Sequence, residues 1–172
     1  MEDIKEKNIV TIIRIIVIII VLTIIGIIGY NYYKKNLIKK TTKEFKNYIN
    51  SNYETDSNEK IYYIPLKEKH ILTKITKLND KDNSNVAISY NEDKSITGTL
   101  EMHGKNNYGI NGVSYLKSTL KNDEFDCQII SNKGYTARCD LLKKYTEEFK
   151  TEIKDIFKKA KINPNYVKTK TV

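Results

Sequence analysis

The chain has 172 residues, a formal net charge of +9 and 40% hydrophobic residues, with two Cys, two Pro and no Trp. This length fits one small domain with an appendage, so a large multi-domain enzyme is excluded. Two cysteines allow a single bridge, which excludes a scaffold held together by many disulfides. The hydrophobic residues gather near the N-terminus, while the rest of the chain is rich in Lys, Asn and Tyr.

The first predicted element is a membrane-spanning helix at residues 9–29, after a short tail at residues 1–8. The segment is apolar except for Thr11, Arg14 and Thr23, and about 20 helical residues span the ~30 Å hydrocarbon core. Tyrosines and lysines follow it directly, as they do at membrane–water interfaces. A cleaved signal peptide is the alternative. Because the run is longer than a usual signal core and has no Ala-x-Ala motif, we expect an uncleaved, single-pass signal anchor.

Residues 30–50 predict a juxtamembrane helix that continues the membrane helix. They contain no Pro or Gly, and the side chains of one face recur at helical spacing, namely Leu37, Ile38, Thr41, Phe45, Tyr48 and Ile49. We expect the following domain to cover this stripe. A polar segment at residues 50–60 predicts a loop, and residues 61–162 predict a small α+β domain.

Short segments of this domain predict an antiparallel sheet built from hairpins. Residues 86–90 and 96–102 alternate apolar and polar side chains, which predicts a hairpin in which Tyr90 faces Ile96. Pro65 suits the first position of a helix, so we expect a short helix from there to residue 75. Residues 113–120 fit a strand or a short helix, and the pattern does not decide between them.

The two cysteines lie on opposite sides of a predicted three-residue turn at residues 132–134. If the chain folds back about Lys133, Cys127 lies opposite Cys139. Directly opposed residues of antiparallel strands have Cα atoms about 4.5–5.5 Å apart, within disulfide range. This register favours a structural disulfide, and hence an extracytoplasmic domain. Two reduced, buried cysteines are the alternative.

The last long segment predicts an amphipathic helix that starts at residue 142 and ends near residue 161, before Pro164. Its apolar face offers a candidate docking surface for a partner, formed by Tyr145, Phe149, Ile153 and Phe157. Residues 163–172 predict a frayed tail.

No motif for nucleotide binding, metal-dependent proteolysis or a nucleophilic serine occurs in the chain. We therefore expect no enzymatic activity, no cofactor and no metal. His70 and His103 lack the spacing of zinc ligands. The segment with Asp80, Asp82 and Ser84 resembles a calcium loop superficially, but Asn residues stand where that loop needs Gly and Glu. We expect a solvated loop there.

The charge pattern bears on orientation and on partners. Lysines are more numerous after residue 29 than before residue 9, which by the positive-inside rule favours a cytoplasmic domain. Such a Lys-rich domain would bind nucleic acid or anionic lipid. Long domains, however, translocate largely regardless of charge, and the lysines are interspersed with acids. Nucleic acid is therefore the less favoured partner.

The order of the elements resembles type IV pilin-like proteins of low-GC Gram-positive bacteria. Those proteins lay a long helix, apolar in its first half and amphipathic in its second, against an antiparallel sheet, and many carry a late disulfide. Tyr63-Ile64-Pro65-Leu66 through Ile75 looks like the short helix after the pilin spine, and the Cys127/Cys139 hairpin looks like the late cysteine pair. The chain lacks the Gly-Phe-Thr-Leu-x-Glu processing sequence, so no functional residue is carried over.

The resulting hypothesis is a non-enzymatic, membrane-anchored surface or envelope protein that acts by protein–protein contacts or self-assembly. Its sharpest form is a pilin-like subunit with its domain outside the cytoplasmic membrane. One alternative is an accessory subunit of a membrane secretion or conjugation complex. The other is the cytoplasm-facing, Lys-rich domain that binds nucleic acid or anionic lipid.

Overall fold

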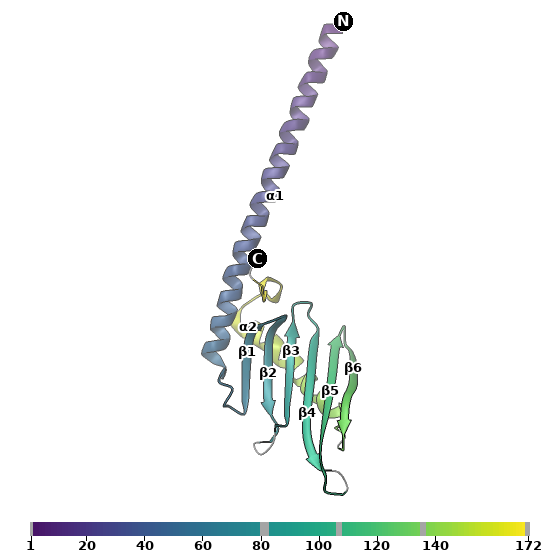
Figure 1. Cartoon of the computed structure of the whole chain (residues 1–172). Helices are drawn as coiled ribbons and strands as arrows, with labels where there is room; N and C mark the ends of the chain where they lie inside the picture. The colour runs from purple at the N-terminus through teal and green to yellow at the C-terminus, as the bar shows by residue number, and fades with distance from the viewer. Residues whose placement is uncertain (1, 80–82, 106–107, 135–136, 171–172) are drawn as a thin grey trace.

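The computed structural model describes residues 2–79, 83–105, 108–134 and 137–170, with side chains from Thr11 onward, and has an α+β fold (Figure 1). A long N-terminal helix leads into a six-stranded antiparallel sheet, and a second helix lies across one face of the sheet. The strands follow one another in chain order, so each pairs with the next. The predicted fold class is confirmed. The elements are α1 (Glu2–Asn52), β1 (Ile61–Lys67), β2 (His70–Lys77), β3 (Asn85–Asn91), β4 (Ile96–Lys105), β5 (Asn111–Lys121), β6 (Glu124–Lys133), α2 (Cys139–Ala160) and the 3₁₀-helix η1 (Pro164–Tyr166).

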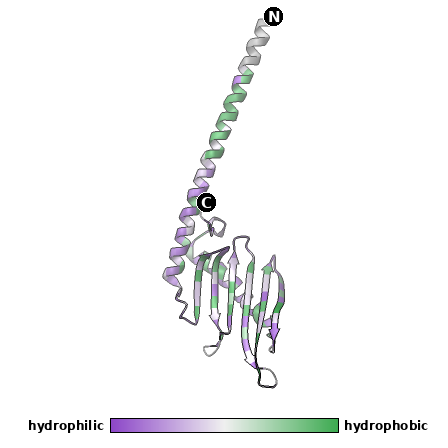
Figure 2. Cartoon of the chain, viewed as in Figure 1, coloured by the Kyte–Doolittle hydropathy of each residue, from purple (hydrophilic) through white to green (hydrophobic). Residues whose placement is uncertain are grey.

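The helix α1 is continuous, but its two halves have different surroundings. In residues 12–28 the large apolar side chains are 48 to 63% exposed, and the described part of the domain leaves this stretch uncovered (Figure 2). The stretch is long and apolar enough to cross a membrane. Farther along, Phe45 and Ile49 are completely buried against the domain. The predicted continuation of the helix is confirmed. The predicted covering of its stripe is confirmed from Thr41 onward, at Thr41, Phe45, Tyr48 and Ile49.

The core lies between α2 and one face of the sheet. The buried side chains of α2 recur every three or four residues, so a single face of the helix meets the sheet. Gly98 in β4 permits this close approach, because a Cβ there would lie 2.6 Å from the Ser118 hydroxyl oxygen and 2.9 Å from a methyl group of Leu142. Residues 113–120, which fitted either element, belong to strand β5.

The predicted β3–β4 hairpin is confirmed to the residue, because Tyr90 pairs with Ile96. The short helix expected from Pro65 to Ile75 is wrong. Those residues form the β1–β2 hairpin, in which Ile64 pairs with Thr73. The strand pairing shifts register between His70 and Leu72, and the three consecutive residues Ile71, Leu72 and Thr73 are buried. This break in the alternation hides the strand from the sequence. This correction also applies to the stretch that resembled the short helix of pilins.

The hairpin expected about Lys133 is also wrong. Strand β6 pairs with β5, where Cys127 faces Ser118, and Cys139 is the first residue of α2. The two cysteines are nevertheless joined by a disulfide, with Cα atoms 6.1 Å apart. The bridge therefore links β6, an edge strand of the sheet, to the first residue of α2. Strand β6 pairs with β5, which directly precedes it in the chain, as consecutive strands usually do. Tyr135 and Thr136, part of the expected second strand, lie outside the described residues.

The C-terminal segment, expected to be frayed, packs against the domain as far as residue 170. Val167 is completely buried. The Thr42 hydroxyl of α1 donates to the Tyr166 carbonyl at 3.4 Å and accepts from the Lys168 N–H at 3.1 Å. Thr169 donates from its N–H and its hydroxyl to the Glu92 carboxylate, at 2.5 and 2.6 Å. The segment thus connects α1 to the β3–β4 turn.

Candidate functional site

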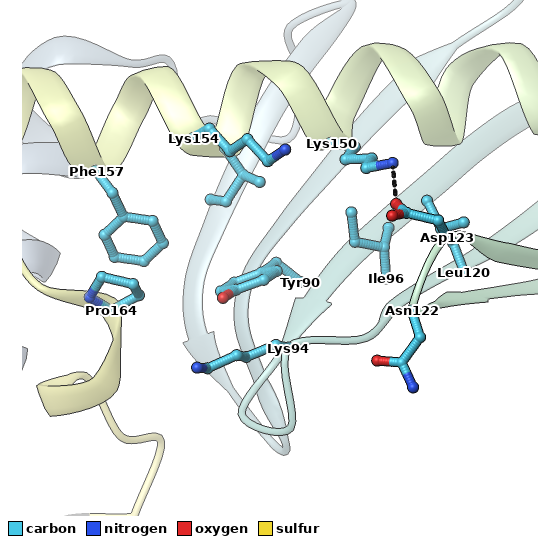
Figure 3. A pocket seen from close by; sticks show the side chains of 11 residues that line it. Tyr90, Lys94, Ile96, Leu120, Asn122, Asp123, Lys150, Lys154, Phe157 and Pro164 are labelled. Carbon is cyan, nitrogen blue, oxygen red and sulfur yellow. Dashed lines mark hydrogen bonds and ion pairs between the residues drawn. The ribbon is translucent and has the colours of Figure 1, made fainter.

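A pocket of about 430 Å³ opens where the β3–β4 and β5–β6 turns meet the second half of α2 (Figure 3). These turns lie at the end of the sheet that faces the apolar half of α1 (Figure 1). The pocket is lined by Tyr90, Lys94, Ile96, Leu120, Asn122, Asp123, Lys150, Ile153, Lys154, Phe157 and Pro164.

The floor of the pocket is apolar because of the strand register. Tyr90 pairs with Ile96, and Ile96 pairs with Leu120, so the three side chains form one row across β3, β4 and β5 on the face toward α2. Phe157 closes the row from α2, with its ring 5.8 Å from the half-buried Tyr90 ring. Burial, followed by the nearby Asp93 carboxylate, raises the pKa of Tyr90 above its ordinary value.

The β3–β4 turn, residues 92–95, is held by the Asp93 carboxylate. This group accepts from the Ser95 hydroxyl at 2.5 Å, the Ser95 N–H at 3.1 Å and the Lys121 ammonium at 3.2 Å. These contacts lower the pKa of Asp93 to about 2. The next residue, Lys94, has a left-handed backbone with φ 69°. Residues other than Gly, Asn and Asp rarely adopt this conformation. The turn thus fixes Lys94 at the mouth of the pocket.

The β5–β6 turn forms the opposite side of the mouth. Asn122 and Asp123 both have positive φ, 51° and 66°, which suits a tight two-residue hairpin loop. The Asp123 carboxylate lies 2.7 Å from the Lys150 ammonium of α2. This hydrogen bond lowers the pKa of Asp123 and raises that of Lys150. The acid of the pocket is therefore already neutralised by a lysine.

Two other lysines at the mouth have no hydrogen-bond or ion-pair partner among the residues that the structure describes. Within the described residues, the ammonium groups of Lys94 and Lys154 form no hydrogen bond or ion pair. Figure 3 shows the Tyr90 ring between these two side chains. The described residues that line the pocket include no Ser, Cys or His. An apolar floor beside two lysines that form no ion pair with any described residue is suited to binding an anion.

The helix face predicted to dock a partner is largely occupied by the domain itself. Phe149, Ile153 and Phe157 are buried in the core, and Tyr145 is partly buried. Phe157 also stacks on Phe45 of α1 at 5.0 Å. An amphipathic sequence pattern indicates that a helix face will be covered, but it does not indicate whether the cover comes from the same chain. Of these four residues, Ile153 and Phe157 border the pocket.

The remaining residues considered from the sequence lie apart from the pocket. Cys127 and Cys139 form the disulfide at the far end of α2. His70 is within 2.6 Å of Asn91, and His103 is within 2.8 Å of Glu101. In the part of the chain that the structure describes, no three His, Cys, Asp or Glu side chains gather to hold a metal. Asp80 and Asp82 lie outside that part.

Most residues of the pocket are not predicted from the sequence, although the sequence contains one signal for it. Asn122-Asp123 lies between two alternating segments, and such a pair favours a two-residue hairpin loop. A two-residue loop at Asn122-Asp123 predicts that β5 pairs with β6 and that Leu120 lies close to the loop. The pairing of β4 with β5, which completes the floor, has no comparable local signal. The chain matches no protein family, no curated protein and no solved structure.

Proposed function

We propose that the protein is anchored in the cytoplasmic membrane by α1 and holds its domain on the extracytoplasmic side. There it acts by contacts with other envelope molecules. The observation that carries this proposal is the contrast within α1, whose apolar residues 12–28 are uncovered while Phe45 and Ile49 are completely buried. Each Å² of apolar surface left in water costs about 25 cal/mol, and a bilayer removes that cost.

The continuous helix also sets the height of the domain above the bilayer. The proposed span ends at Gly29, and the domain first buries α1 at Thr41. At ~1.5 Å per residue these twelve positions span about 18 Å. This spacing supports a role in which the domain is presented away from the membrane surface.

The disulfide supports the extracytoplasmic side. Disulfides persist in oxidising compartments and are rare in the cytosol, and Cys127 and Cys139 are within bonding distance. The lysines that follow residue 29 favour the opposite orientation, but positive charge has little influence on the translocation of long domains. The disulfide is therefore the stronger of the two indications.

Thiol labelling in intact cells tests the orientation. A membrane-impermeant maleimide is expected to label Cys127 and Cys139 only after treatment with an impermeant reductant. The Cys139→Ser variant leaves Cys127 as a single thiol, which should be labelled in intact cells without a reductant. Labelling that needs cell lysis but no reductant would place the domain in the cytoplasm and contradict the proposal.

A second candidate is self-assembly through α1, as in a pilin-like subunit. It is favoured by one observation, a single helix with an uncovered apolar half and a half packed on an antiparallel sheet. Replacing residues 9–29 with an unrelated apolar helix separates the two candidates. An assembling subunit loses its oligomers on this exchange, whereas a tethered domain keeps its partners.

A further inference from the structure

We propose that the pocket between α2 and the two turns is a binding site for a small amphiphilic anion. The ligand class is a monocarboxylate with an aliphatic or aromatic body. The apolar body would lie on the floor, and the carboxylate would meet Lys94 and Lys154. This proposal does not depend on which side of the membrane the domain occupies.

The size and the floor of the pocket fit such a body. The volume of about 430 Å³ falls within the ~300–1,000 Å³ of typical small-molecule sites. Ile96, Leu120 and Ile153 are at most 4% exposed, so they present a closed apolar surface. Contact with an apolar ligand removes the remaining exposed surface of the Tyr90 and Phe157 rings from water.

The charges of the lining select the sign of the ligand. Lys94, Lys150 and Lys154 stand against one acid, Asp123, which gives the lining a net charge of +2. Asp123 is held by Lys150 at 2.7 Å. The ammonium groups of Lys94 and Lys154, which form no hydrogen bond or ion pair within the described part of the chain, are therefore the ones available to a ligand. An anion gains charge-assisted hydrogen bonds there, and a cation of the same shape is repelled.

The mouth of the pocket is held in place by contacts within the chain. Asp93 fixes the β3–β4 turn through three hydrogen bonds, and Lys94 is held in the left-handed region at φ 69°. A glycine would adopt this conformation without steric cost. The turn therefore holds Lys94 at the mouth of the pocket without help from a ligand.

The geometry favours a free ligand over a phospholipid that remains in the bilayer. The C-terminal segment connects the β3–β4 turn to α1 at the level of Thr42, which is about 20 Å of helix beyond Gly29. Headgroups extend only about 5–8 Å beyond the hydrocarbon core. A lipid would therefore have to leave the bilayer to enter the pocket.

Calorimetric titration of the full chain in nanodiscs of neutral lipid tests the proposal, with sodium octanoate as the probe and empty nanodiscs as the blank. Saturable binding of one octanoate per chain is expected. Octanol and octylammonium, which have the same body without the negative charge, should bind about tenfold more weakly or not at all. Absence of saturable binding above the blank, or equal binding of octylammonium, would overturn the proposal.

A matched pair of variants locates the site. Lys94→Gln with Lys154→Gln should weaken octanoate binding by about tenfold or more. Lys133→Gln with Lys144→Gln removes the same charge outside the pocket and should leave the affinity unchanged. Equal losses in both double variants would mean general attraction to a basic protein, which contradicts a built site.

The variant Lys94→Gly separates binding from folding. It removes the ammonium group and relieves the left-handed backbone, so the Tm should stay the same or rise while octanoate binding weakens. A site at this position requires that combination. Unchanged octanoate affinity in the folded Lys94→Gly variant would exclude Lys94 from the site.

Discussion

The ring of Phe45 in α1 stacks on the ring of Phe157 in α2, with centroids 5.0 Å apart. This contact joins the helix that carries the apolar N-terminal segment to the helix that covers the sheet. Both rings lie in the core, so α1 and the rest of the domain share one set of buried side chains. Separation of α1 from the domain would expose this surface.

The Phe45→Ala variant is expected to destabilise the domain strongly. Deleting a completely buried aromatic ring removes apolar contacts and leaves a cavity, which costs about 3–5 kcal/mol. The free energy of unfolding from denaturant titration, followed by circular dichroism, measures this loss. Ile129→Ala is the control, because Ile129 is half exposed and its truncation should cost far less. If Phe45→Ala lowers the free energy of unfolding as little as Ile129→Ala does, α1 is not part of the core.

Reduction of the disulfide is expected to destabilise the fold by about 3 kcal/mol, because the Cys127–Cys139 bridge closes a loop with a sequence separation of 12 residues. The midpoint of urea unfolding, with and without dithiothreitol, measures the effect. The double variant Cys127→Ser with Cys139→Ser should already be destabilised and should not respond to the reductant. A response in that variant would indicate an effect of the reductant elsewhere.

Stability at acidic pH should depend in part on Asp93. Its pKa is lowered from 3.8 to about 2 by hydrogen bonds from Ser95 and by Lys121. A lowered pKa means that the ionised carboxylate stabilises the folded state. This contribution is complete above about pH 4 and disappears as the pH falls toward 2. Asp93→Asn should lower the Tm at neutral pH and reduce the slope of Tm between pH 4 and 2. An unchanged slope would show that Asp93 does not titrate as the turn geometry implies.

The Gly98→Ala variant tests the close contact of α2 with the sheet. The added Cβ would lie within 3 Å of Ser118, Ile88 and Leu142, and overpacking of this kind costs about 1–3 kcal/mol. Thermal unfolding measures the loss. Adding Ser118→Ala removes the hydroxyl oxygen that is the nearest of the three contacts, so the double variant should recover part of the stability. No recovery would place the steric conflict with Leu142 and Ile88 instead.

Local sequence patterns predicted several elements correctly. The apolar run of α1, the amphipathic repeat of α2 and the Tyr90–Ile96 register each follow from the chemistry of a few neighbouring residues. They do not depend on which other segment lies nearby. Helical periodicity fixes a helix face, and alternation with a short turn fixes a hairpin register.

The structure around the two Cys residues does not follow from the local sequence pattern. The sequence predicts the Cys127–Cys139 pair correctly, but through a hairpin that does not form. The residues after Gly134 had two available structures, a strand beside β6 or the start of α2. The tertiary structure decides for the helix, because β6 pairs with β5 and Leu142 is then completely buried.

The sequence by itself determined a helix apolar enough for a membrane, an amphipathic second helix, one hairpin register and the cysteine pair. The tertiary structure alone decided that Pro65 to Ile75 form strands, that the C-terminal segment packs on Thr42 and Glu92, and that Tyr90, Lys94 and Lys154 surround one pocket. The physical reason is that short segments of ambiguous periodicity take their structure from the partners that bury them. A pocket between turns distant in sequence depends on which strands become neighbours.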